Sequence, residues 1–174
     1  MNEFFEEEQA LLKRYRGGDE SALKLLIERY QQKVFALVLY SAGCNLDKAY
    51  EITVSSFVGA VRRIPSLSGK ASFIRALICS AIQNVKGAKT ILSPDEVDSS
   101  DSSAVKKEMH RVVKRSLLAL PFDIKVILLL RDQINLPYED ISSTLELTEV
   151  NVKTKLAQGR AQLREKIVSM VGRP

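Results

Sequence analysis

Apolar side chains recur at three- and four-residue steps along most of the chain, with polar residues between them. This spacing places the apolar side chains on one face of an α-helix, whereas a half-buried strand would show strict alternation. No alternating segment is found, so the predicted fold class is all-α. The predicted helices cover residues 4–16, 20–41, 46–64, 73–86, 105–120 and 123–131, followed by a helix-turn-helix over residues 137–165.

Turn-forming residues separate the first four helices. Residues 17–19 (GGD) combine a helix stop with a cap for the next helix, and residues 43–45 (GCN) precede the third helix. Pro, Ser and Gly cluster in residues 65–72, which predicts a loop. The fourth helix is almost continuously apolar and is expected to be the most buried. These four helices predict an α-bundle domain over residues 1–88.

Residues 89–104 interrupt the helical pattern. They are acidic, rich in Ser and without periodicity, which predicts a flexible linker. Residues 105–174 then form a second small helical domain that contains the helix-turn-helix. A linker of this kind permits both an open and a compact arrangement of the two domains. A compact arrangement would block the face carrying Lys153 and Gln158 only if it covered them.

The helix-turn-helix begins with a short helix at Tyr138 and turns at residues 146–147. Thr148 is then placed to cap a second, longer helix. Leu147 and Val152 flank this cap with the spacing of a hydrophobic staple, which fixes the angle at which the chain enters the second helix.

The second helix has two different faces. Its apolar stripe consists of Val152, Leu156, Leu163, Ile167 and Met170. The opposite face carries small, amide and basic side chains, which suit the major groove of DNA. An ordinary solvated face would have a similar composition, so both interpretations stay open at this point. The residues of the candidate reading face are Asn151, Lys153, Thr154, Lys155, Ala157, Gln158 and Arg160.

Charge is distributed unevenly along a chain whose total net charge is +5. Residues 1–90 carry 13 Lys and Arg against 9 Asp and Glu, residues 91–104 carry none against 4, and residues 105–174 carry 13 against 8. Two basic domains separated by an acidic linker favour a polyanionic partner, although proteins that never bind nucleic acid show similar excesses.

Catalytic and metal chemistry find little support in the sequence. Cys44, Cys79 and His110 lack the spacing of a zinc site or a Cys–His pair, and the two cysteines are expected to be buried free thiols. No phosphate-binding loop or nucleophile–base pair is found, so we expect no enzyme, no catalytic residue, no metal and no cofactor. An acidic N-terminus and the lack of an apolar run of about 20 residues predict a cytoplasmic protein without membrane insertion.

The order of motifs in residues 117–165 closely resembles region 4 of bacterial RNA polymerase sigma factors of the extracytoplasmic-function (ECF) group, in the sigma-70 family. The matching segments are residues 117–121 (LLALP), 126–131 (VILLLR), 138–141 (YEDI), 152–156 (VKTKL), 159–160 (GR) and 163–165 (LRE). The resemblance implies a reading helix that binds the −35 promoter element through the face defined above. It also implies that Arg131 and Tyr138 hold the DNA backbone.

The N-terminal domain resembles region 2 of the same group through Gly18, Asp19, Tyr30, Phe57 and residues 69–73 (GKASF). The resemblance implies binding to core RNA polymerase by the helix over residues 46–64, with Asp47, Glu51 and Phe57 as the contacting residues. It also implies that the loop over residues 66–72 and its flanking helices engage the −10 element, where a flipped base needs a compensating pocket. The −10 residues would be Arg62, Arg63, Ser66, Ser68, Lys70, Ser72 and Arg75.

Region 2 departs from the family's usual pattern. Residues 54–56 (VSS) replace a usually acidic and glutamine-rich patch, and Val61 and Ala76 stand where tryptophan is common. The family also often has Arg at the position of Gln158. The expected partners are core RNA polymerase, promoter DNA and an anti-sigma factor. Two alternatives stay open: a sigma-like regulator or polymerase-binding decoy that cannot melt promoters, and an interaction module sequestered by an anti-sigma factor.

Overall fold

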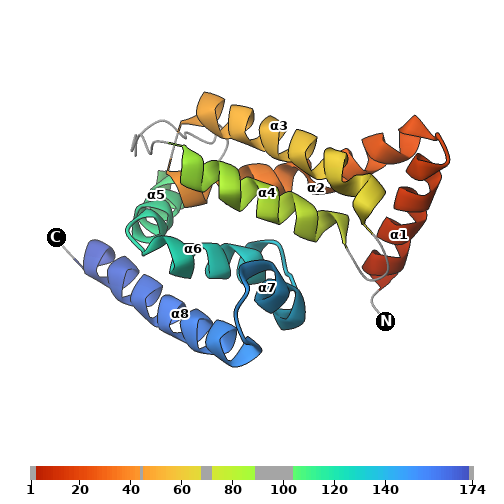
Figure 1. The fold of residues 1–174 in the computed structure, drawn as a ribbon. Coiled ribbons are helices and arrows are strands. Elements are labelled where there is room, and N and C mark those ends of the chain that lie inside the picture. Colours follow the sequence, from red (N-terminus) through yellow and green to blue (C-terminus); the bar gives the residue numbers. More distant parts are fainter. Residues whose placement is uncertain (1–2, 44, 68–71, 89–103, 173–174) are drawn as a thin grey trace.

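The computed structural model describes residues 3–43, 45–67, 72–88 and 104–172 of the 174-residue chain, without the side chains of residues 3–5 and 104–107. Within these ranges every regular element is helical, which confirms the all-α prediction (Figure 1). Of the predicted linker, only Ala104 lies within the described residues. The elements are α1 (Glu3–Arg16), α2 (Glu20–Ala42), α3 (Leu46–Arg63), η1 (Ile64–Ser66), α4 (Phe73–Gly87), α5 (Ala104–Leu118), α6 (Phe122–Leu128), η2 (Leu129–Gln133), α7 (Tyr138–Leu145) and α8 (Glu149–Val171).

The predicted starts of α2 and α3 are confirmed by their caps. The Asp19 side chain accepts a hydrogen bond from the backbone N–H of Ser21 at 3.0 Å, and the Asn45 side chain accepts one from Lys48 at 2.9 Å. These bonds satisfy N–H groups that have no partner inside the helix. Gly43 ends α2 with a φ of 62°, a left-handed conformation that favours glycine.

Helices α1 to α4 form the N-terminal lobe, in which α2 contacts α1, α3 and α4. Leu12, Leu26, Phe73 and Leu77 are fully buried between them. Leu77 lies in α4, where Ile78 is also fully buried, as the nearly continuous apolar sequence of this helix predicts. The third and fourth helices make the most extensive contact in the lobe.

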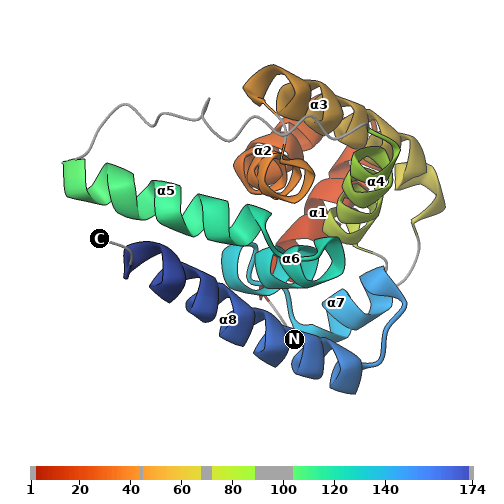
Figure 2. The ribbon, with the colours of Figure 1, turned by 90° about the vertical axis from the view of Figure 1, so that its left-hand side faces the viewer.

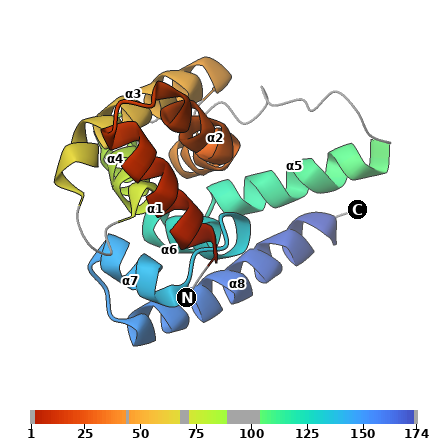
Figure 3. The same cartoon turned by 90° about the vertical axis from the view of Figure 1, so that its right-hand side faces the viewer.

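Helices α5 to α8 form the C-terminal lobe. The long helix α8 packs against α5, α6 and α7. Figures 2 and 3 show α5 and α8 side by side, with the start of α5 next to the end of α8. Val152 and Leu156 are buried on the inner face of α8, as its apolar stripe predicts.

The sixth helix differs from the prediction of one continuous α-helix over residues 123–131. It changes at Leu129 into a π-helical turn, in which the N–H of Ile134 donates to the carbonyl of Leu129, five residues earlier, at 3.0 Å. Asn135 then adopts a φ of 64°, which Asn tolerates better than most residues. The wider turn directs the chain out of the helix and into α7.

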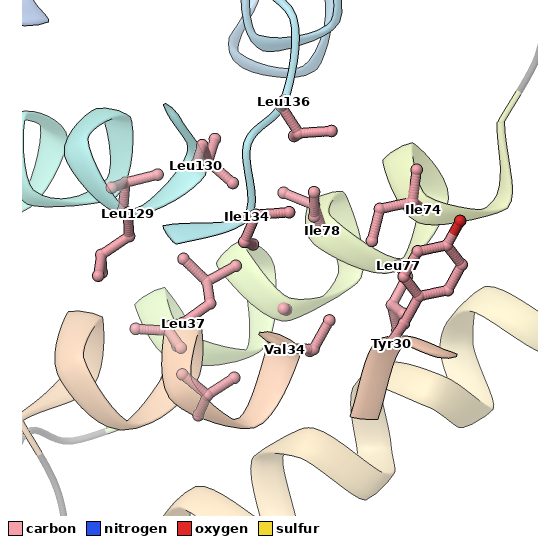
Figure 4. Packing of buried hydrophobic residues seen from close by; sticks show 14 of the residues in the cluster. Tyr30, Val34, Leu37, Ile74, Leu77, Ile78, Leu129, Leu130, Ile134 and Leu136 are labelled. Carbon is pink, nitrogen blue, oxygen red and sulfur yellow. The ribbon is translucent and has the colours of Figure 1, made fainter. Parts of the chain in front are cut away.

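The two lobes share one hydrophobic core (Figure 4). Val34 and Leu37 of α2 and Ile78 of α4 lie opposite Leu130 and Ile134 of the C-terminal lobe. Contacts also join α4 to α7 and α2 to α5 and α6. The lobes are therefore packed against each other through buried apolar side chains, and the arrangement is the compact one of the two that the sequence permits.

Candidate nucleic-acid interface

The turn between α7 and α8 fixes the direction of the reading helix. Glu146 ends α7 with a φ of 55°, and the N–H of Leu147 donates to the carbonyl of Ser142 at 2.9 Å. Thr148 then caps α8, because its side-chain oxygen accepts the N–H of Asn151 at 3.2 Å. Leu147 is half-buried against the core that contains Val152, consistent with the predicted staple. The predicted helix-turn-helix and its cap are confirmed.

Gly159 sets how closely α8 approaches α6. A Cβ atom at this position would lie 2.7 Å from Cγ2 of Ile124 and 3.2 Å from two carbon atoms of Leu128. Only glycine leaves room for this contact without a shift of the neighbouring side chains. The inner face of α8 therefore packs closely against α6 at Gly159, the residue that follows Gln158 of the reading face.

The opposite face of α8 is open to solvent. Lys155 is half-buried, and the compact packing of the lobes covers neither Lys153 nor Gln158. The Thr154 hydroxyl donates to the carbonyl of Val150 at 2.9 Å. The exposed side chains are Asn151, Lys153, Thr154, Ala157, Gln158 and Arg160.

Two basic side chains, from the elements before and after α7, lie over the ring of Tyr138. Arg131 places its guanidinium carbon 4.7 Å from the Tyr138 ring centroid, and Lys153 places its ammonium 5.3 Å from it. Arg131 also donates to the carbonyl of Leu136 at 2.7 Å, which holds the connection before α7. Lys153 forms an ion pair with Glu149 at 3.6 Å. The cluster therefore places Arg131 and Tyr138, the predicted contacts to the DNA backbone, next to Lys153 of the reading face. It also brings two positive charges close together.

Arg160 is held differently from the other basic side chains of α8. Two of its nitrogens donate to the carboxylate of Asp132, at 2.5 and 3.3 Å. These hydrogen bonds raise the pKa of Arg160. The positive charge is therefore retained but partly neutralised by its partner, which weakens the case for Arg160 as a free phosphate ligand.

The predicted −10 residues are not all equally accessible. Arg62, Arg63 and Ser66 are exposed at the end of α3 and in η1, and Arg75 is half-buried in α4. Ser72 is buried, and its hydroxyl donates to Glu8 at 2.8 Å, so it faces the protein interior. Ser68 and Lys70 lie outside the described residues.

The predicted polymerase-binding residues lie on or beside an apolar surface of α3. Asp47 and Glu51 are exposed, and Glu51 pairs with Lys48 at 2.7 Å, whereas Phe57 is only 9% exposed. A groove of about 450 Å³ between α2 and α3 is lined by Phe57 and Val61 among other residues. Three more of its lining residues belong, together with Leu46, to an exposed stripe of apolar residues at four-residue steps, which we call the α3 stripe: Leu46, Tyr50, Val54 and Val58.

Of the two cysteines, the structure describes only Cys79. Cys79 is a free, half-buried thiol of α4, less buried than predicted, and its sulfur lies 3.9 Å from the carbonyl oxygen of Thr144. Burial raises the pKa of the Cys79 thiol. Cys44 lies outside the described residues. In the described ranges, no group of three or more His, Cys, Asp or Glu residues could hold a metal ion, and none of the helices could cross a membrane.

Known proteins resemble this chain over nearly its whole length. A family model described as sigma-70, region 4 matches residues 110–163, which run from α5 into α8. The ECF RNA polymerase sigma-E factor of Haemophilus influenzae is 28% identical over 181 residues, covering 92% of this chain and 95% of the relative. Those of Salmonella typhimurium and Escherichia coli K12 are each 24% identical over 187 residues, covering 95% of this chain and 97% of each relative. By these similarities the chain is an RNA polymerase sigma factor, and the relatives it resembles over nearly its whole length are of the ECF group.

The fold agrees with this assignment. A solved structure of CnrH in complex with the cytosolic domain of CnrY has a TM-score of 0.75 and 16% sequence identity. It covers 94% of this sigma factor and 98% of the solved chain, so both lobes have the same overall fold. Region 4 of the sigma factor contains the whole cluster around Tyr138 and the exposed face of α8.

Two features of this sigma factor were missed by the sequence analysis. The α3 stripe could have been found from its four-residue spacing, which places all four residues along one side of a helix. Glu8 could not have been found in this way. It lies in the acidic run of residues 6–8, where nothing distinguishes the one buried carboxylate from its exposed neighbours.

Proposed function

We propose that this sigma factor binds core RNA polymerase through region 2 and reads a promoter at two points, the −35 element with α8 and the −10 element with the end of α3 and the start of α4. It acts in the cytoplasm as an initiation factor and not as an enzyme. The observation that carries this proposal is the exposed Lys153–Gln158 face, on a helix whose inner face is locked against α6 at Gly159.

The −35 contacts follow from the chemistry of the exposed side chains. Lys153 can meet guanine or a phosphate, and Gln158 or Asn151 can pair with adenine, because their donors and acceptors match the base edges in the major groove. Arg131 and Tyr138 reach the DNA backbone from the preceding turn. Because these two contact phosphates, they position the helix without reading sequence.

Region 2 supplies the other two contacts. The α3 stripe with its groove offers core RNA polymerase an apolar surface, and Asp47 and Glu51 lie at the start of the same helix. Arg62, Arg63 and Arg75 provide the positive charge that capture of a single strand needs. An anti-sigma factor is a further proposed partner, since the similarly folded CnrH was solved together with a second protein, CnrY.

A second candidate function is that of a polymerase-binding regulator that does not melt DNA. Two observations favour it: the chain contains no Trp, and Ser72 is buried rather than presented to a flipped base. Binding to core polymerase and to a −35 fragment is common to both functions. Opening of the −10 element separates them.

The reading face is tested by the double variant Lys153→Ala with Gln158→Ala. Each bidentate base contact contributes about 1–3 kcal/mol, so −35 duplex binding should weaken by on the order of tenfold or more. Affinity for core polymerase should stay unchanged. The matched control is Gln162→Ala with Lys166→Ala, which removes the same side-chain types further along α8 and outside the proposed face.

Fluorescence anisotropy of labelled −35 duplexes, measured at one fixed salt concentration, gives the −35 affinity of each double variant. If the control pair weakens binding as much as the Lys153 and Gln158 pair does, α8 contributes only general charge, and the assignment of its reading face is wrong.

A further inference from the structure

The first helix makes polar contacts with both ends of the segment that joins α3 to α4. Glu8 is 1% exposed, and its carboxylate accepts four hydrogen bonds. The Ser72 hydroxyl and the Phe73 N–H donate to Oε1 at 2.8 Å each, and the Ile74 N–H donates to Oε2 at 3.2 Å. The Tyr30 hydroxyl completes the set at 2.7 Å. Every donor except Tyr30 belongs to the start of α4.

Glu8 takes the place of the cap that α4 lacks. Ser72 stands at the N-cap position, but its side chain makes no capping hydrogen bond to the helix. The first N–H groups of a helix need an acceptor, and a negative charge is favoured there by the helix dipole. Burial and the Glu8 carboxylate raise the pKa of Tyr30, which keeps its hydroxyl protonated as a donor. Four donors offset the cost of burying this carboxylate.

Arg16 holds the other end of the segment. Its Nη2 donates to the carbonyl of Ile64 at 2.9 Å and also to the carbonyl of Leu67. Ile64 begins η1 and its carbonyl also accepts the N–H of Leu67 at 3.2 Å, whereas Leu67 directly follows the turn, so the two contacts of Arg16 span η1. Arg16 is itself exposed, so replacing it leaves no cavity in the core.

Glu8 and Arg16 lie eight residues apart on α1, or about 12 Å along the helix axis. One rigid helix therefore determines the distance between the end of η1 and the start of α4. Arg62 and Arg63 precede the first of these ends, and Arg75 follows the second. The connecting residues 68–71 lie outside the described part of the chain.

We propose that Glu8 and Arg16 are positioning residues, which hold Arg62 and Arg63 at a fixed separation from Arg75 so that these cations can engage the −10 element together. This role rests on the function proposed above. Without the Arg16 contacts the two groups of cations separate more freely, and capture of the melted strand loses its preorganisation.

The test uses the full-length protein with core polymerase and promoter DNA that carries 2-aminopurine in the −10 element, whose fluorescence rises when the base unstacks. Arg16→Ala should lower the fraction of open complex on the order of tenfold, as expected for losing charge-assisted hydrogen bonds. Lys13→Ala is the matched control, because it removes the same charge from an exposed position on α1. Binding of a −35 duplex should be unchanged in both variants.

Each result has a distinct meaning. If the wild type binds core polymerase but produces no fluorescence rise, the proposed function fails. If the wild type opens DNA and Arg16→Ala opens it as well as Lys13→Ala does, the positioning role is overturned.

A second measurement needs no polymerase. Glu8→Gln keeps the size of the side chain but replaces one acceptor oxygen with an NH2 group, so amide hydrogen exchange at Phe73 and Ile74 should become at least tenfold faster. Exchange that stays at the wild-type rate in the folded variant would show that Glu8 does not hold the start of α4.

Discussion

Replacing Gly159 with alanine tests how the reading helix is seated. The added Cβ would lie 2.7 Å from Cγ2 of Ile124, well inside the roughly 3.5–4.0 Å of an ordinary carbon–carbon contact. Overpacking of this kind costs about 1–3 kcal/mol. Alanine in place of glycine inside a helix recovers about 0.8–1.0 kcal/mol. The free energy of unfolding should therefore fall by up to about 2 kcal/mol.

Gly87→Ala is the control for the propensity effect alone. Gly87 ends α4, and an added Cβ there would have no atom within 4 Å, so the same substitution should stabilise the protein by up to about 1 kcal/mol. Urea unfolding followed by circular dichroism gives the free energy of unfolding of each variant. Both curves are fitted with one common m-value, the slope of this free energy against urea concentration. The contact between α8 and α6 would be refuted if Gly159→Ala stabilised the protein as much as Gly87→Ala.

Gly159→Ala has a functional consequence as well. We expect α8 to relieve the clash by moving away from α6, which displaces Lys153 and Gln158 relative to Arg131. Binding of the −35 duplex should weaken even at temperatures where the variant is fully folded. Unchanged −35 affinity in a destabilised Gly159→Ala variant would mean that the Ile124 and Leu128 side chains absorb the change instead of the helix.

Three further predictions concern the C-terminal lobe. Glu146→Gly should raise the free energy of unfolding by about 1 kcal/mol, because a left-handed backbone is strained for glutamate, and Asn135→Gly should raise it less; equal gains in urea unfolding would contradict this. Burial lowers the pKa of Lys125, so the unfolded chain binds more protons between that lowered value and 10.5, and stability rises with pH across this range. Wild type should therefore gain stability relative to Lys125→Met as pH approaches 10.5 in denaturant titrations, and a constant difference would disprove the linkage. Arg131→Ala should weaken binding to all duplexes alike and reduce the slope of log affinity against log salt by about 1, whereas Arg131→Lys should keep the slope; sequence-selective loss would instead indicate a base contact.

Periodicity and caps were sufficient to predict most of the helices. The N-caps Asp19 and Thr148 lie where a polar side chain precedes an apolar repeat, and local hydrogen bonds decide such boundaries. The π-helical turn after Leu128 was not predictable, because residues 126–130 are all apolar and fit either helix type.

Contacts between segments that are far apart in the chain could not be predicted from the sequence. Val34, Leu37 and Ile78 lie in helices that were predicted, but nothing in their spacing says that they meet Leu130 and Ile134 of the other lobe. The face of α8 could be predicted because its two sides differ in chemistry along one helix. The positions of Glu8 and Arg16 depend instead on partners 22 or more residues away in the chain.

Run-off transcription with purified core RNA polymerase tests the central claim most directly. The protein is combined with core enzyme and genomic fragments, and transcripts are mapped to their start sites. Transcripts should start downstream of one shared pair of −35 and −10 sequences, and the Lys153→Ala with Gln158→Ala variant should lose them while still binding core. Binding to core without any specific transcript would contradict the claim that this sigma factor opens promoters, and failure to bind core would contradict both functions considered for it.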